Sequence, residues 1–258
     1  MWSEPPLSWE PCEPEAGELE RAEKEALGSP EFDRLGLKAG IWNGYKAGQV
    51  KLVCRRLGGL ARVIAFLPAG VKPAWEFWGR VFQWFGAAPN RRPWKVFWFG
   101  ALTERNFPLV GQDLGPEHVN GGYTHVCSTD GICIYRAEEA TRVLIHEMLH
   151  AACLDEPDWS IPMREAMIET WAELILVALV AKGRVPAAKR LWSKQSHWVV
   201  DTNAKAAEAH NTHDITDYAW RYLTGREQMY ARLGVALPAP RHNPGQNSVR
   251  FTHPALEV

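Results

Sequence analysis

The sequence predicts an α+β protein, with a mixed α/β N-terminal lobe built on a small sheet and a helical C-terminal lobe. Short runs rich in β-branched and aromatic residues, bounded by Gly and Pro, occur only in the first 136 residues. From residue 137 onward the apolar residues recur with the 3.6-residue period of an α-helix. The chain has 258 residues, of which 46% are hydrophobic and 23% charged, so it can bury such a core without disulfides or metal.

Five segments make up the predicted N-terminal lobe. Residues 63–67 and 94–100 are predicted strands because of their β-branched and aromatic content. Residues 73–85 begin with Pro and are apolar nearly all round, which indicates a buried helix. Residues 122–127 and 132–136 flank an Asp-Gly pair and form a predicted hairpin at the sheet edge.

Four helices are predicted after the hairpin, over residues 137–153, 163–182, 186–198 and 215–233. The first of them belongs to the upper lobe and is expected at the seam between the two lobes. The other three form the helical lower lobe.

The chain is predicted to contain one folded domain between two irregular ends. Residues 1–35 are rich in Pro and Glu and are expected to be a mobile acidic tail with one short helix. The domain covers residues 36–235, divided into an upper lobe (36–153) and a lower lobe (154–235). Residues 236–258 are expected to be an irregular C-terminal tail.

Charge and cysteine usage bear on the partners and the location of the protein. The net charge of −1 gives no field that favours nucleic acid or an anionic membrane. The N-terminus lacks the pattern of a signal peptide, and the longest apolar run, residues 174–181, is too short to span a bilayer. The five cysteines are scattered, without a Cys-x-x-Cys pair, which predicts free thiols in an intracellular, cytoplasmic protein. Cys127 and Cys133 flank the predicted turn and are interpreted as chance neighbours.

Thirteen tryptophans are many for a chain of this length, and they cluster in residues 75–84 and 94–98. Such clusters usually belong to the core, and we favour this interpretation. The alternative is a Trp-rich surface that binds a protein partner.

The motif His146-Glu147-Met148-Leu149-His150 carries the chemistry of the sequence. Histidines four residues apart project from the same face of a helix, where their imidazoles can bind one Zn²⁺. The carboxylate of Glu147 lies about 100° around the helix and can accept a proton from an activated water and pass it to a leaving amine. The motif therefore predicts a zinc site, in preference to two histidines with only packing roles.

A third ligand is expected from the next helix, where Glu165, Glu169 and Glu173 form one stripe with spacing i, i+4, i+8. Their neighbours are mostly apolar, and acids on a buried helix need a metal or another partner. Helical spacing alone does not choose among the three glutamates.

His146-Glu147-x-x-His150, followed after eighteen residues by Glu169, resembles the gluzincin zinc metallopeptidases of the thermolysin and aminopeptidase group. The resemblance covers residues 120–182 and implies a zincin-like fold that hydrolyses peptide bonds in a peptide or protein substrate. It implies that Glu169 is the third zinc ligand, that Glu173 orients a zinc-bound histidine, and that residues 132–136 form the strand that holds substrate. The Gly-x-Met-Glu-Asn motif of the aminopeptidases is missing.

A peptidase also needs a donor for the oxyanion that forms when water attacks the carbonyl. In gluzincins a Tyr or His of the helical lobe has this role. The candidates are His210, His213, Tyr218 and Tyr222. Tyr218 is our first choice and His213 the second.

Two alternatives remain open. SprT-like proteases have a similar His-Glu-x-x-His helix, but take their third ligand from a later His near a Gly, and none occurs before His197. The other alternative is a non-catalytic protein that keeps the zincin fold as an assembly scaffold. Metzincins fit less well, because Cys153 and Glu156 stand where that group requires Gly and His.

Overall fold

The computed structural model describes residues 7–209, 214–241 and 247–258 and confirms the α+β class. The chain divides into two compact units. Unit 1 consists of Met1–Glu104, Asn120–Leu154 and Val258. Unit 2 consists of Arg105–Val119 and Asp155–Glu257.

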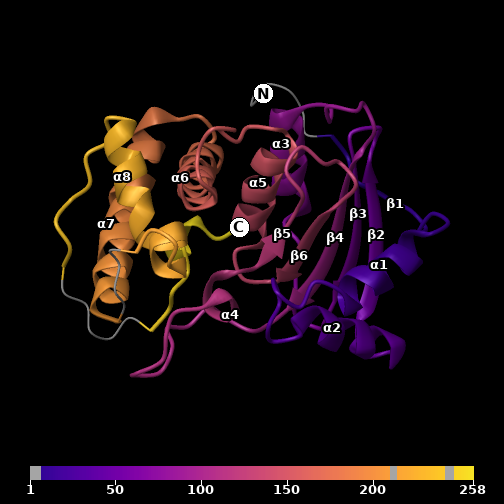
Figure 1. Cartoon of the computed structure of the whole chain (residues 1–258). Helices are drawn as coiled ribbons and strands as arrows, with labels where there is room; N and C mark the ends of the chain where they lie inside the picture. The colour runs from indigo at the N-terminus through magenta and orange to yellow at the C-terminus, as the bar shows by residue number, and fades with distance from the viewer. Residues whose placement is uncertain (1–6, 210–213, 242–246) are drawn as a thin grey trace. The chain divides into compact units, whose positions relative to one another are not determined.

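Unit 1 contains a mixed sheet of six strands among the described residues, in the order β1-β2-β3-β4-β6-β5 (Figure 1). The strands are β1 (Glu10–Pro11), β2 (Lys51–Leu57), β3 (Ala61–Leu67), β4 (Trp94–Ala101), β5 (Gly122–Tyr123) and β6 (Ile132–Arg136). The central pairs β3–β4 and β4–β6 are parallel, and the other pairs are antiparallel. The predicted hairpin is present as β5–β6, but its first strand is only two residues long.

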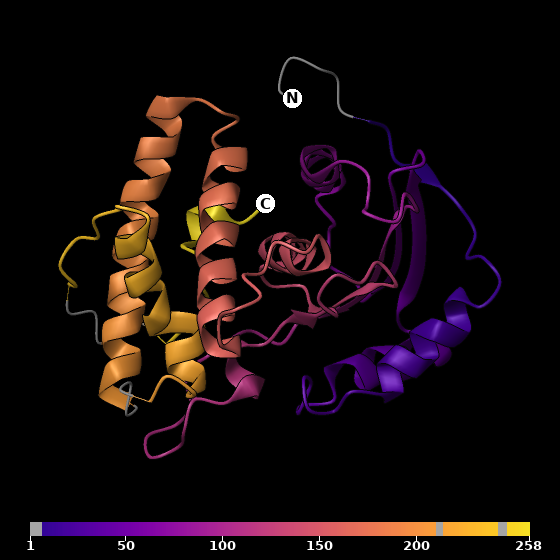
Figure 2. The ribbon, with the colours of Figure 1, turned by 45° about the horizontal axis from the view of Figure 1, so that its top comes forward.

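Helices cover both faces of this sheet, as Figure 2 shows. The helices are α1 (Glu18–Leu27), α2 (Leu37–Lys46), α3 (Trp75–Phe85) and α5 (Ala140–Ala151). On one face, Trp42 of α2 packs against Phe66, which stacks on Phe99. On the other face, Trp78 of α3 lies 4.9 Å from Trp98, measured between ring centroids. The strands of the centre are thus buried on both sides, as parallel strands require.

The tryptophan clusters are mainly core, as predicted. Trp78, Trp94 and Trp98 are only 1–2% exposed. Among the described tryptophans, Trp84 and Trp171 are the exposed ones, at 42% and 41%.

Unit 2 is helical, and its longest elements are α6 and α7. Its elements are α4 (Pro116–Val119), α6 (Ile161–Val180), α7 (Val185–Ala209), the π-helix η1 (Trp220–Thr224), α8 (Gly225–Arg232) and the 3-10 helix η2 (Pro254–Leu256). One apolar cluster of this unit joins Leu114 and Val119 to Ala206, Leu223 and Phe251. The early segment Arg105–Val119 therefore contributes to the core of unit 2.

The described parts of both chain ends are more closely packed than the predicted tails, although the short helix predicted within residues 1–35 is present as α1. At the N-terminal end, β1 pairs with β2, and α1 buries Ala22 and Ala26 against the sheet. At the C-terminal end, Phe251 and Leu256 are buried in unit 2, and Gln195 donates to the carbonyl of Phe251. Pro is abundant in both stretches and Glu in the first, but a few small or apolar residues suffice to dock them.

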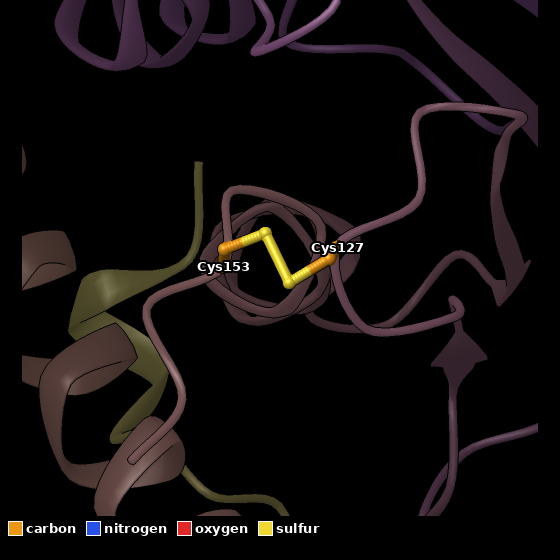
Figure 3. Close-up of a disulfide and its surroundings, with 2 residues drawn as sticks. All are labelled: Cys127 and Cys153. Carbon is orange, nitrogen blue, oxygen red and sulfur yellow. A yellow bond between two sulfur atoms is a disulfide. The ribbon is translucent and has the colours of Figure 1, made fainter. Parts of the chain in front are cut away.

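The prediction that all five cysteines are free thiols is wrong for two of them. Cys127 and Cys153 form a disulfide, with Cα atoms 4.5 Å apart (Figure 3). Cys133 does not face Cys127 across the hairpin, because it is buried in the core of unit 1. Cys12, which directly follows β1, and Cys54 of β2 are free thiols, with sulfurs 3.0 Å apart.

No helix in the part of the chain that the structure describes combines the length and apolar character needed to cross a membrane.

Candidate metal centre

Helix α5, which carries the His-Glu-x-x-His motif, is positioned by the strand before it. All five residues of β6 are buried, and Glu139 then turns the chain with a left-handed φ of 57°. The helix begins at Ala140, three residues later than predicted, because this turn interrupts the helical backbone. Trp78 of α3 donates to Thr141 in the first turn. Every residue of α5 is buried, so its histidines lie on an interior face.

The two histidines of α5 bring their Nε2 atoms together. His146 and His150 are 6% and 5% exposed, and their Nε2 atoms lie 3.1 Å apart with the ring planes at 70°. Two imidazoles that bind one Zn²⁺ tetrahedrally, at Zn–N distances of about 2.05 Å, hold their nitrogens about 3.3 Å apart. The pair therefore fits a zinc ion in its spacing and in its donor chemistry.

The carboxylate of Glu147 lies beside the edge strand β5, at a position where that strand has no side chain. A Cβ added to Gly122 would be 3.2 Å from Oε1 of Glu147 and 2.5 Å from Cγ1 of Val143. Only glycine fits between the strand and the helix at this place. Sequence reasoning did not select Gly122, since its role depends on the approach of two elements that helical periodicity does not reveal.

The predicted acids of α6 lie in unit 2, where they differ in burial. Glu169 and Glu173 are 2% and 0% exposed, whereas Glu165 is half-buried. Glu173 forms an ion pair with Arg226 and accepts a hydrogen bond from Tyr230, both on α8. Within unit 2 the observed partners of Glu173 are thus a guanidinium and a phenol.

The predicted oxyanion donors also belong to unit 2. Tyr218 stacks on Tyr222, with ring centroids 5.5 Å apart, and Arg221 lies over the ring of Tyr218. The pKa of Tyr222 is raised well above its ordinary value, first by burial and then by the negative charge of Glu165. Tyr222, which the sequence offered only as one of four candidates, is therefore influenced by the charge of Glu165 and, to a smaller extent, of Glu169.

His210 and His213 lie outside the described residues.

The π-helix η1 packs against α6 through Trp220, which shares an apolar cluster with Ala166. A Cβ added to Gly225 would lie 2.6 Å from the carbonyl oxygen of Trp220 and 3.1 Å from Cβ of Ala166. The close packing of η1 on α6 thus depends on a glycine. Single-turn π-helices are often found at functional sites, because they redirect one side chain of an otherwise regular helix.

Comparisons of the chain with protein-family models, with curated proteins and with solved structures found no match. The chemistry of the site must therefore be argued from its own residues. A buried pair of imidazoles with a carboxylate next to one of them can provide metal ligands and a proton acceptor on a single helix.

Proposed function

We propose that this protein is a zinc-dependent peptidase that hydrolyses peptide bonds in a peptide or protein substrate. The observation that carries the proposal is the 3.1 Å separation of the Nε2 atoms of His146 and His150 on a buried helix. Burial of two imidazoles in contact is unfavourable unless a metal or a shared proton holds them together. Glu147, between them in sequence, supports hydrolysis over a purely structural metal site.

The proposed roles follow the chemistry of each side chain. His146 and His150 supply two nitrogen ligands, and Glu169 supplies the third ligand, as the gluzincin-like spacing indicates. When bound, Zn²⁺ supplies a Lewis acid for water and for the scissile carbonyl. Glu147 accepts a proton from the attacking water and delivers it to the leaving amine. Tyr218 donates a hydrogen bond to the oxyanion.

The metal content is measured on protein that has never been exposed to a chelator or to an immobilised-metal column. We expect elemental analysis to give about one zinc per chain. His146→Ala and His150→Ala should each lose this zinc, since each removes one ligand. Wild-type protein that stays far below stoichiometry after zinc is added would refute the metal site.

Hydrolysis is tested by comparing wild type with Glu147→Gln on a broad peptide library. The variant should keep its zinc and lose activity by roughly two or more orders of magnitude, because only the proton acceptor is removed. Glu76→Gln is the matched control, since Glu76 is an exposed acid on α3. Equal cleavage by wild type and Glu147→Gln would assign the activity to another source. A zinc-loaded wild type that cleaves nothing would favour the scaffold alternative.

A further inference from the structure

Both cysteines of the Cys127–Cys153 disulfide are hydrogen-bonded to the backbone of His150, the second histidine of the motif. The backbone N–H of Cys127 donates to the carbonyl of His150 at 3.0 Å, and that of Cys153 donates to the same carbonyl at 3.1 Å. Cys127 lies in the loop between β5 and β6, and Cys153 follows the cap of α5 at Ala152. One carbonyl of the candidate metal centre thus joins the loop, the helix end and the disulfide.

Both cysteines occupy backbone positions that normally favour glycine. Cys153 has a φ of 60° directly after the helix cap, and Leu154 N–H donates to the carbonyl of Leu149 at 3.1 Å. This is the Schellman arrangement, in which glycine is the preferred residue at the left-handed position. Cys127 has a φ of 59° in a turn closed by a hydrogen bond from Ser128 to His125. A residue with a side chain is disfavoured at a left-handed φ. Two cysteines at such positions therefore indicate that their sulfur atoms have a function.

The pair is also the accessible one. Both Cys127 and Cys153 are exposed, and Figure 3 shows their bridge beside the end of the helix. Cys133, in contrast, is buried, and burial raises the pKa of its thiol to about 12. Exposed disulfides are the ones that thiol reductants attack readily.

We propose that Cys127 and Cys153 form a reversible redox site whose state controls how tightly the metal centre binds zinc. This inference rests on the proposed zinc site. A dithiol reductant attacks one sulfur to form a mixed disulfide, and its second thiol then displaces the protein sulfur. The protein gains two electrons and two protons as two thiols, and the reductant leaves as its own disulfide. Reduction removes the covalent tie on the loop that bonds His150, so the two imidazoles are held less firmly.

The test compares the zinc dissociation constants of oxidised and reduced protein by competition with a chromogenic chelator. A water-soluble phosphine is the reductant, because it reduces the disulfide without the zinc-binding thiols of a dithiol reagent. The two-hydrogen mass difference reports the redox state. We expect reduction to weaken zinc binding about 10–100-fold, the range for loss of a support behind a metal ligand.

Two double variants separate the covalent bond from the backbone conformation. Cys127→Ser/Cys153→Ser lacks the bond, and Cys127→Gly/Cys153→Gly lacks it while relieving the left-handed backbone. We expect both variants to bind zinc as weakly as reduced wild type, in either the presence or the absence of phosphine. Cys12→Ser, which removes a thiol from the other cysteine pair, should respond to phosphine as wild type does.

The outcomes distinguish the two proposals. If oxidised and reduced wild type bind zinc equally, or if the double-Gly variant matches oxidised wild type, the redox site is refuted and the zinc site stands. Tighter binding by reduced wild type also refutes it, since the thiols would then act as ligands. If no form binds zinc, both proposals fail.

Discussion

At the scale of single residues, the three glutamates of α6 differ in their burial and in the side chains that they contact. Glu173 is fully buried with the equally buried Arg226, and Tyr230 donates a hydrogen bond to it. Removing one partner of such a pair leaves an uncompensated charge in the interior, which costs about 3–5 kcal/mol. Glu173 therefore has a structural role in unit 2, whatever it contributes to a metal. Glu169 is also buried, whereas Glu165 is half-buried.

Glutamine substitutions at these three positions should separate stability from metal binding. Glu173→Gln should lower the free energy of unfolding by about 3–5 kcal/mol, because Arg226 loses its counter-charge. Glu169→Gln should abolish stable zinc binding, and Glu165→Gln should leave it nearly intact. Denaturant unfolding of the metal-free proteins and chelator competition measure the two properties. If Glu165→Gln loses zinc and Glu169→Gln keeps it, the third ligand lies one helical turn earlier than proposed.

At this scale, the sequence predicts which side chains lie together when one helix contains the whole pattern. His146, Glu147 and His150 needed only the periodicity of a helix to be grouped. The Cys127–Cys153 bond and the Glu173–Arg226 pair join residues far apart in the chain. Their pairing depends on how whole elements pack, and no local pattern encodes it.

At the scale of elements, the N-terminal helix α1 is tied to the sheet by one buried carboxylate. Glu18 is 3% exposed and accepts hydrogen bonds from Arg62 of β3 at 2.8 Å, and Lys95 of β4 lies 2.9 Å away. Burial by itself raises the pKa of Glu18, but its hydrogen bonds, that of Arg62 foremost, lower it more, so the net pKa is below the ordinary 4.5. The charged carboxylate is thus favoured in the folded state.

Glu18→Gln should destabilise the protein by about 3 kcal/mol near neutral pH. A lowered folded-state pKa contributes stability that is complete above the unfolded value of 4.5 and is lost as the pH falls through the folded pKa. The difference in unfolding free energy between wild type and variant should therefore shrink below pH 4.5, measured by urea unfolding at several pH values.

Glu10→Gln provides the matched control for this prediction. Glu10 forms an exposed ion pair with Arg56, with both side chains more than half exposed. Exposed pairs contribute less than about 1 kcal/mol, so this variant should remain close to wild type. A Glu18→Gln protein as stable as Glu10→Gln would show that α1 is held by apolar contacts alone.

Among the elements, long periodic helices and buried strands were predicted well, and edge elements were not. In strand β2 only Cys54 and Leu57 are buried, and the strand carries two arginines, so its composition does not stand out as a strand. Helix α2 contains two glycines and only a short apolar face, so its sequence does not predict a helix. The packing of Trp42 on the sheet stabilises it in the structure. Both elements depend on tertiary packing for their stability, which propensity does not report.

At the scale of the whole molecule, the chain crosses between the two units four times, after Glu104, Val119, Leu154 and Glu257. The segment Arg105–Val119 leaves unit 1 after β4 and returns before β5. It places Leu114 and Val119, which are 4% and 2% exposed, in an apolar cluster of unit 2. Unit 2 is therefore assembled from two separate pieces of sequence.

A fragment of residues 155–257 should fold poorly by itself. It lacks Leu114 and Val119, and each buried aliphatic side chain contributes about 1.5–3 kcal/mol. Domains are stable by only about 5–15 kcal/mol, so this loss is a large part of the total. Thermal unfolding followed by circular dichroism should show a broad transition that sharpens and shifts upward when a peptide of residues 105–119 is added.

The same peptide with Leu114→Ala and Val119→Ala is the control and should have little effect. A fragment that unfolds cooperatively at one temperature with either peptide or with none would contradict the two-piece description of unit 2.

The insertion of Arg105–Val119 between β4 and β5 also has a consequence for synthesis on the ribosome. Residues up to Leu154 emerge first and include every described strand of the sheet, so unit 1 can fold while the rest is still being translated. During that interval Leu114 and Val119 have left the tunnel before their partners Leu223 and Phe251 exist. A nascent chain arrested just after Leu154 has left the tunnel should therefore bind holdase chaperones through this segment, and release them as the last helices appear.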